Sequence, residues 1–217
     1  REILTRYARQ DIRFLLRQGA DVILAACGTV SSVVLDDIKS DFSIPLFGVV
    51  DASVNAALAA TKNEKIGVIG TGATISSGAF AKKIAAANPH AAVTSIACPL
   101  FVPLVENGYI GRGCTVTREV AADYLAPLRD EGIDTLILGC THFPIIADII
   151  GDLLPGVTLV NSGAAAAAEV AAVCGKTSGS GSASFFVSDS PVNFDTVARV
   201  FLGGETIRAQ KVDIEVY

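Results

Sequence analysis

Short apolar segments alternate with helical segments along almost the whole chain. Strands are predicted at 22–26, 44–50, 66–70, 92–98, 135–139, 157–160 and 184–187, and helices at 2–18, 30–39, after 50, 76–88, 118–131, 164–173 and from Pro191. Strands this apolar, when joined by helices, form parallel sheets that are covered on both faces. The sequence therefore predicts an α/β protein, with a loop at the Gly- and Ser-rich stretch 175–182.

One pattern occurs twice. Residues 22–29 (VILAACGT) and 135–142 (TLILGCTH) are both an apolar strand that ends near a cysteine, followed by a small polar turn and a predicted helix. This repetition predicts two similar α/β subdomains with mostly parallel sheets. Because open α/β sheets bind ligands beyond the carboxyl ends of their strands, Cys27 and Cys140 are expected in a shared cleft between the subdomains.

Composition excludes several classes of protein. The chain is 51% hydrophobic and 18% charged, which is not typical of a disordered chain. The 17 basic residues are scattered, which argues against nucleic-acid binding. No apolar run approaches the roughly 18 residues of a membrane span, and no signal peptide is recognised. Five cysteines without a CxxC motif, and only two histidines, favour a reducing cytoplasm and no metal site.

Cys27 and Cys140 suggest a specific chemistry. A cysteine at a helix N-terminus is expected to have a lowered pKa, although a cysteine that ends an apolar strand is often only a small buried hydrophobe. Two thiols on opposite sides of a cleft suit the inversion of a carbon centre, in which one removes a proton and the other delivers one. His142 follows Cys140 by two residues and either assists these transfers or has only a structural role.

A Gly- and Thr-rich turn at 67–76 (GVIGTGATIS) is a further candidate site. It leads from a strand into a helix and offers backbone N–H groups and hydroxyls to a carboxylate or a phosphate. It lacks the GxGxxG spacing of a dinucleotide loop. Thr71 and Thr74 are therefore predicted as carboxylate ligands.

Four motifs in order carry a family resemblance: AACGTVSS at 25–32, GVIGTGATISS at 67–77, CPLFVPLVENG at 98–108 and LGCTHFPII at 138–146. Together they resemble the glutamate racemases of the aspartate/glutamate racemase family, and the resemblance covers essentially the whole chain. It implies racemisation of L-glutamate to D-glutamate without a cofactor, supply of D-glutamate for peptidoglycan, and a homodimer. It also implies that residues 1–50 with 163–217 form one subdomain and residues 51–162 the other.

The resemblance also implies roles for individual residues. Cys27 would exchange the proton on the D-glutamate face and Cys140 on the L-glutamate face, assisted by His142 and Glu106. The substrate would be held by Gly28, Thr29, Thr71, Thr74, Thr141 and His142. The chain departs from the family at Gly28, where relatives usually carry Asn, and it lacks the Asp-Ser-Gly and Pro-Tyr-Gly segments. We therefore expect an N-terminal segment to precede Arg1.

Three alternatives remain open from the sequence. The substrate could be aspartate or another acidic amino acid, because the motifs do not separate side-chain lengths. Cys140 and His142 could form a nucleophile–base pair for amide hydrolysis, but that reaction gives Cys27 no role. A two-lobed protein that only binds a small ligand is the third alternative, and the paired strand-end thiols argue against it.

Overall fold

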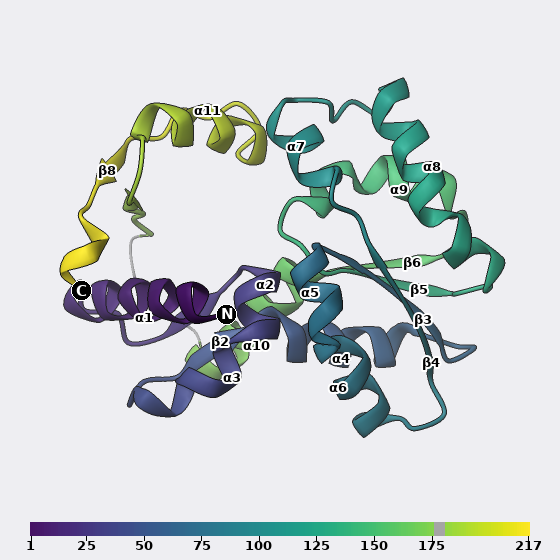
Figure 1. Cartoon of the computed structure of the whole chain (residues 1–217), viewed down its shortest axis with the longest axis horizontal. Coiled ribbons are helices and arrows are strands. Elements are labelled where there is room, and N and C mark those ends of the chain that lie inside the picture. The colour runs from purple at the N-terminus through teal and green to yellow at the C-terminus, as the bar shows by residue number, and fades with distance from the viewer. Residues whose placement is uncertain (176–180) are drawn as a thin grey trace.

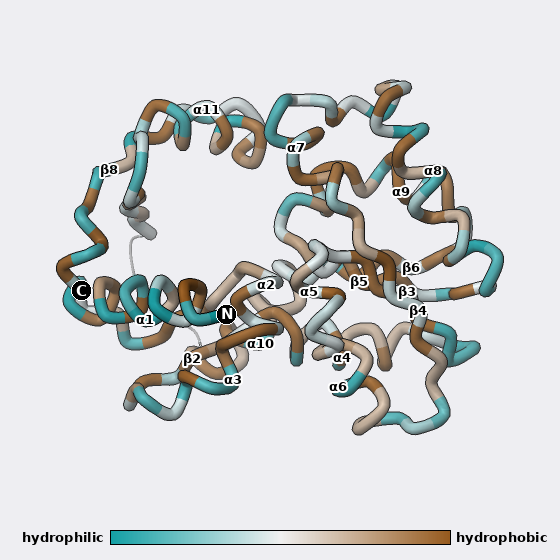
Figure 2. The backbone as a smooth tube through the Cα atoms, in the orientation of Figure 1, coloured by the Kyte–Doolittle hydropathy of each residue, from teal (hydrophilic) through white to brown (hydrophobic). Residues whose placement is uncertain are grey.

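The larger sheet of the molecule has four parallel strands in a computed structural model that describes residues 1–175 and 181–217 (Figure 1). In spatial order they are β4 Ala92–Ala97, β3 Lys65–Gly70, β5 Thr135–Leu138 and β6 Thr158–Asn161. Strands β3 and β5 are strongly apolar and appear as brown runs in Figure 2. The predicted parallel α/β sheet is confirmed, whereas the loop predicted at 175–182 falls mostly on residues outside this description.

Helices cover both faces of this sheet because its strands are apolar on both sides. In β5, Leu136 and Leu138 pack into one core with α7, α8 and α9, while Ile137 packs into another with α4 and α6. This split follows from the alternation of side chains along a strand. The helices are α4 Val49–Ala60, α5 Gly72–Ser77, α6 Ala79–Ala87, α7 Phe101–Glu106, α8 Thr115–Asp130, the 3-10 helix η2 Phe143–Ile146, and α9 Ala147–Leu153.

We call the four-stranded sheet with these helices the second half; the first half is built from both ends of the chain. Its elements are α1 Glu2–Arg17, β1 Ile23–Ala25, α2 Gly28–Val33, α3 Leu35–Ile38, η1 Lys39–Asp41, β2 Leu46–Gly48, β7 Phe185–Val187, β8 Ala209–Lys211 and η3 Ile214–Val216. β1 pairs with β2 and β7 pairs with β8, both in parallel. Phe14 of α1 joins the two chain ends through edge-to-face contacts with Phe186 and Tyr217.

Three helices connect the halves. α4 begins directly after β2, and α10, Ser162–Cys174, begins directly after β6. These two helices pack against each other, with Val49, Ala52 and Ala166 buried between them. α11, Pro191–Phe201, leaves the β7–β8 ribbon and reaches α7 of the second half (Figure 1). The sequence predicted that α11 begins after Ser190. The Ser190 side chain indeed caps this helix, because it accepts a hydrogen bond from the backbone N–H of Asn193.

Two predicted helices are each divided. The helix predicted at 30–39 is α2 followed by α3, with Val34 between them. The helix predicted at 76–88 starts earlier, as α5, and is interrupted by Gly78, whose φ of 65° is left-handed and favours glycine. Within residues 1–175 and 181–217, no helix is both long enough and apolar enough to cross a membrane.

Candidate active site

The predicted site residues follow the carboxyl ends of three parallel strands. Cys27 comes after β1 and is the N-cap of α2, Thr71 comes after β3 and is the N-cap of α5, and Cys140 comes after β5. Cys27 is exposed, whereas Cys140 is 8% exposed. Gly28, the residue after Cys27, lies against the carbonyl of Gly139, the residue before Cys140. The structure thus brings together the two thiols that the sequence repeat predicted.

A hydrogen-bonded chain extends from Cys140 through His142 to Glu106. The Cys140 Sγ lies 3.8 Å from His142 Nδ1, which is also 3.2 Å from the Thr141 hydroxyl. On the other side of the ring, His142 Nε2 lies 2.9 Å from Glu106 Oε1. A carboxylate can only accept, so Nε2 carries the proton and Nδ1 presents its lone pair to the thiol. His142 is therefore placed to receive a proton from Cys140 or return one.

The surroundings of Cys140 favour its protonated form. Burial raises the pKa of this thiol most strongly, and negative charge on Cys27 and Glu106 raises it further. Hydrogen bonds from the His142 backbone N–H and the Thr141 hydroxyl lower the pKa but do not offset burial. The prediction of a lowered pKa was therefore wrong for Cys140, which precedes a 3-10 helix rather than capping an α-helix. A protonated thiol is suited to deliver a proton to a substrate carbon.

Cys98 shows that the position at a strand end does not by itself create a reactive thiol. It follows β4, as Cys140 follows β5, but it is fully buried in the apolar core. Burial raises its pKa to about 12. Cys98 therefore fits the alternative of a small core residue, in contrast to the exposed Cys27.

Three threonine hydroxyls form a cluster beside the thiols. The Thr29 hydroxyl lies 2.9 Å from that of Thr71 and 3.3 Å from that of Thr74, and the latter two are 3.0 Å apart. Thr29 belongs to α2 in the first half, while Thr71 and Thr74 belong to the turn and helix after β3. Since each hydroxyl can also donate outward, a carboxylate can replace these mutual bonds. The two motifs predicted to bind substrate therefore meet at one place.

A cavity of about 610 Å³ lies beneath Cys27, between β1 and β7. Its lining is mainly apolar and comes largely from α1, β1, β2 and β7, and Asp11 is the one carboxylate that the described residues contribute to it. Burial raises the pKa of Asp11. Among the predicted site residues only Cys27 lines this cavity, so it is separate from the place where the thiols and hydroxyls converge.

Sequence reasoning missed several residues that shape the site. The ring of Phe201 at the end of α11 meets the His142 ring edge-on, with centroids 5.0 Å apart. The Ser162 hydroxyl donates to the Leu138 carbonyl and so fixes the end of β5. Gly139 lies against Gly28 from the other half. The contact of Phe201 with His142 and that of Gly139 with Gly28 join residues far apart in the sequence, so no local motif signals them.

Known proteins share this arrangement. The sequence model of the Asp/Glu/Hydantoin racemase family matches residues 3–170. Glutamate racemase from Geobacter metallireducens is 38% identical, over 99% of this chain and 81% of that protein. The crystal structure of a glutamate racemase isoform from Bacillus anthracis has a TM-score of 0.91 at 31% identity, over 98% of this chain and 81% of that one. That of the Francisella tularensis glutamate racemase with D-glutamate has a TM-score of 0.89 at 32% identity, over 100% and 82%. The chain therefore belongs to the Asp/Glu/hydantoin racemase family and, within it, to the glutamate racemases.

Proposed function

We propose that this chain racemises glutamate, the reaction of its relatives, by proton transfer between Cys27 and Cys140 without a cofactor. In the direction from D-glutamate, the Cys27 thiolate removes the α-proton from one face. The Cys140 thiol then delivers its proton to the opposite face, which leaves Cys27 protonated and Cys140 as the thiolate. The reverse sequence converts L-glutamate. One proton leaves the substrate and another enters it, so no oxidant or reductant is needed, and proton exchange with water returns the two thiols to their starting states.

One observation carries this proposal: two thiols follow β1 and β5, the backbone next to one contacts the backbone next to the other at Gly28 and Gly139, and the buried thiol has a raised pKa. A reaction with two opposed acid–base groups needs one of them protonated while the other is ionised. The raised pKa of Cys140 supports its role as the proton donor in the substrate-free state. The assignment of the D-glutamate face to Cys27 is supported by the family resemblance.

The neighbouring polar groups support the remaining roles. His142 Nδ1 faces the Cys140 thiol and Glu106 orients the imidazole, so this pair would stabilise the proton while it moves. The hydroxyls of Thr29, Thr71 and Thr74 would hold a substrate carboxylate, with the Thr141 hydroxyl and the Gly28 backbone nearby. Glutamate fits the family assignment, and a panel of acidic amino acids would separate it from aspartate.

The test is proton NMR of glutamate with the purified chain in deuterated water and no additive. We expect deuterium to enter the α-position of both L- and D-glutamate, because each thiol exchanges its proton with solvent. Dialysis should not change the rate. Activity that disappears on dialysis and returns only with pyridoxal phosphate would contradict the two-thiol mechanism.

Single substitutions separate the two thiols. Cys27→Ser and Cys140→Ser should each abolish racemisation, since a serine hydroxyl is too weak an acid to replace a thiol. Elimination of HCl from 3-chloroglutamate needs only one base and yields an enamine that hydrolyses to 2-oxoglutarate and ammonia. Cys27→Ser should retain elimination from the L isomer, and Cys140→Ser from the D isomer. Racemisation by Cys27→Ser at the wild-type rate would exclude Cys27 from the mechanism.

The proposal extends to chain organisation and context. Residues 1–50 with 163–217 would form one subdomain and 51–162 the other; this is supported by the membership of the sheets and by the packing of α4 on α10 at the two crossing points. The family resemblance supports a homodimer, a cytoplasmic location and supply of D-glutamate for peptidoglycan. Sedimentation equilibrium would test the dimer as a mass twice the 22.4 kDa of the chain.

A further inference from the structure

Gly28 and Gly139 bring the two halves into backbone contact directly beside the two thiols. A Cβ atom added to Gly28 would lie 2.0 Å from the Gly139 carbonyl oxygen. Each glycine is the chain neighbour of a thiol residue, Cys27 in one case and Cys140 in the other. The distance between these two backbone segments is therefore closely tied to the distance between the two sulfur atoms.

Hydrogen bonds hold the Gly139 backbone in place on one side of this contact. Its backbone N–H donates to the Ile69 carbonyl at 2.8 Å, which extends the pairing of β5 with β3. A Cβ on Gly139 would lie only 2.8 Å from that same carbonyl oxygen. The preceding carbonyl, of Leu138, accepts from the buried Ser162 hydroxyl. The Gly139 carbonyl is thus fixed by the sheet and by the start of α10.

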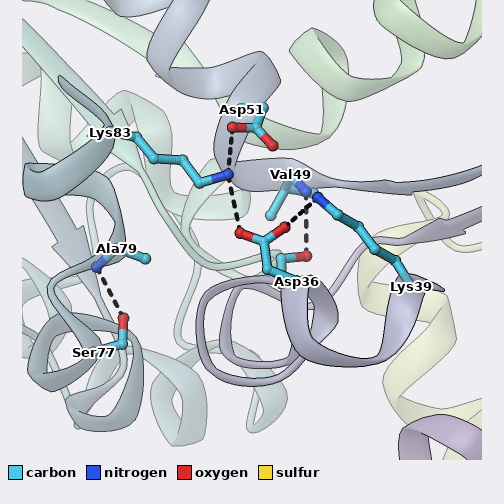
Figure 3. A network of polar contacts seen from close by, with 8 residues as sticks. Asp36, Lys39, Val49, Asp51, Ser77, Ala79 and Lys83 are labelled. Atoms are coloured by element: carbon cyan, nitrogen blue, oxygen red, sulfur yellow. Dashed lines mark hydrogen bonds and ion pairs between the residues drawn. The ribbon is translucent and has the colours of Figure 1, made fainter. Parts of the chain in front are cut away.

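The Gly28 side is held by α2 and α3. Thr29 joins the hydroxyl cluster of the second half, and the Ser31 hydroxyl donates to the Ala25 carbonyl and accepts from the Val49 N–H. Farther along, Asp36 of α3 pairs with Lys83 of α6 at 3.2 Å, which Figure 3 shows as a bridge between elements of the two halves. Moving α2 away from β5 would break or stretch these contacts together.

We propose that Gly28 is a positioning residue that sets the separation of Cys27 and Cys140, by letting the start of α2 rest directly on the Gly139 carbonyl. A side chain at position 28 would move the backbone segments apart by at least 1.0 Å, the difference between 2.0 Å and the 3.0 Å below which real Cβ atoms essentially never approach another atom. A misplacement of about 1 Å in an active site can lower turnover about a hundredfold. The inference rests on the two-thiol mechanism proposed above.

The experiment compares Gly28→Ala and Gly28→Asn with wild type, and uses Gly151→Ala as the matched control. In α9, a Cβ on Gly151 would meet Leu159 at 3.8 Å, an ordinary contact, so its rates should equal those of wild type. For both Gly28 variants, kcat for racemisation should fall about ten- to a hundredfold in each direction. Elimination from L-3-chloroglutamate should fall less than racemisation, because Cys140, Thr71 and Thr74 belong to the second half and only Thr29 of the hydroxyl cluster moves with α2. Elimination from the D isomer, which needs Cys27, should fall with racemisation.

The contrast between the two isomers distinguishes positioning from general damage to the fold. Equal losses of elimination from both isomers would overturn the inference, because they would indicate a merely structural role. Racemisation by Gly28→Ala at the wild-type kcat, or a faster Gly28→Asn, would also overturn it and leave the two-thiol mechanism standing. A wild-type chain that fails to exchange the α-proton would instead overturn the proposed function and this inference with it.

Discussion

His142 is held at both ring nitrogens, and Glu106 supplies the charge on one side. Glu106→Gln keeps an oxygen that accepts from Nε2 but removes the negative charge that stabilises an imidazolium. We expect kcat to fall about tenfold in both directions with little change in KM, since Glu106 touches His142 rather than the substrate carboxylate. Polarimetry with each enantiomer measures both constants. Glu119→Gln on the exposed face of α8 serves as the control, and an unchanged kcat for Glu106→Gln would exclude the charge from the mechanism.

The sequence predicted the position of a site residue correctly where a local pattern, such as the end of an apolar strand, marks it. Cys27, Thr71 and Cys140 were found because each follows a strand, and parallel strands end at one edge of a sheet. The direction of the Cys140 pKa shift was not predictable, because it depends on burial by residues distant in sequence. The contact of Phe201 with His142 and that of Gly28 with Gly139 were missed for the same reason.

At the level of elements, Asp134 ties the loop after α4 to the start of β5. Its carboxylate accepts hydrogen bonds from the hydroxyls of Thr61 and Thr135 and from the backbone N–H groups of Lys62 and Asn63. Burial raises the pKa of Asp134, but these bonds outweigh it and lower the pKa to about 2. The folded-state pKa thus lies below the unfolded value of about 3.9, so this stabilisation is present above pH 4 and is lost as the pH falls towards 2.

We therefore expect Asp134→Asn to lower the free energy of unfolding by about 1–2 kcal/mol at pH 7, after allowing for partial solvent screening. The difference from wild type should shrink as the pH falls and nearly vanish near pH 2. Urea unfolding followed by circular dichroism at several pH values measures this, with Asp130→Asn at the exposed end of α8 as the control. A difference that is constant with pH would mean that the charge of Asp134 contributes nothing.

Elements were predicted well where apolar periodicity is strong and less well where geometry interrupts it. β3, β5 and α1 match their predicted ranges closely, because their apolar patterns are continuous. The breaks at Val34 and Gly78 were not predicted, since only the second has a residue type that marks a break. β8, which spans Ala209–Lys211, is short and mostly polar, so its pairing with β7 depends on the assembled fold.

Across the whole molecule, Lys83 is an ionic link between the halves. Its ammonium group contacts Asp51 at 2.6 Å and Asp36 at 3.2 Å (Figure 3). Exposed ion pairs contribute roughly 0–1 kcal/mol, so Lys83→Gln should change the stability little. If the substrate binds between the halves, losing up to about 1 kcal/mol of attraction between them weakens substrate binding. We therefore expect Lys83→Gln to raise KM up to about fivefold and to leave kcat unchanged.

Salt provides the check on this link. The wild-type KM should rise between low and high sodium chloride as the ion pairs are screened, whereas the KM of Lys83→Gln should already be high and change little. Lys82→Gln, on the same helix, should behave as wild type, because the Lys82 ammonium group donates to the Ser77 carbonyl of its own half. Equal salt dependence in wild type and Lys83→Gln would contradict a role in closure. The sequence predicted two halves but not this link, because surface charges carry no pattern that identifies their partners.

The unequal burial of Cys27 and Cys140 has a consequence for kinetics that follows from mirror symmetry. The two enantiomers of glutamate have the same free energy in water, so kcat/KM must be identical in both directions at every pH. An enzyme with one buried and one exposed thiol is nevertheless chiral, and its complexes with the two enantiomers differ in energy. The ratio of the two kcat values must therefore equal the ratio of the two KM values, however unequal the two thiols make them.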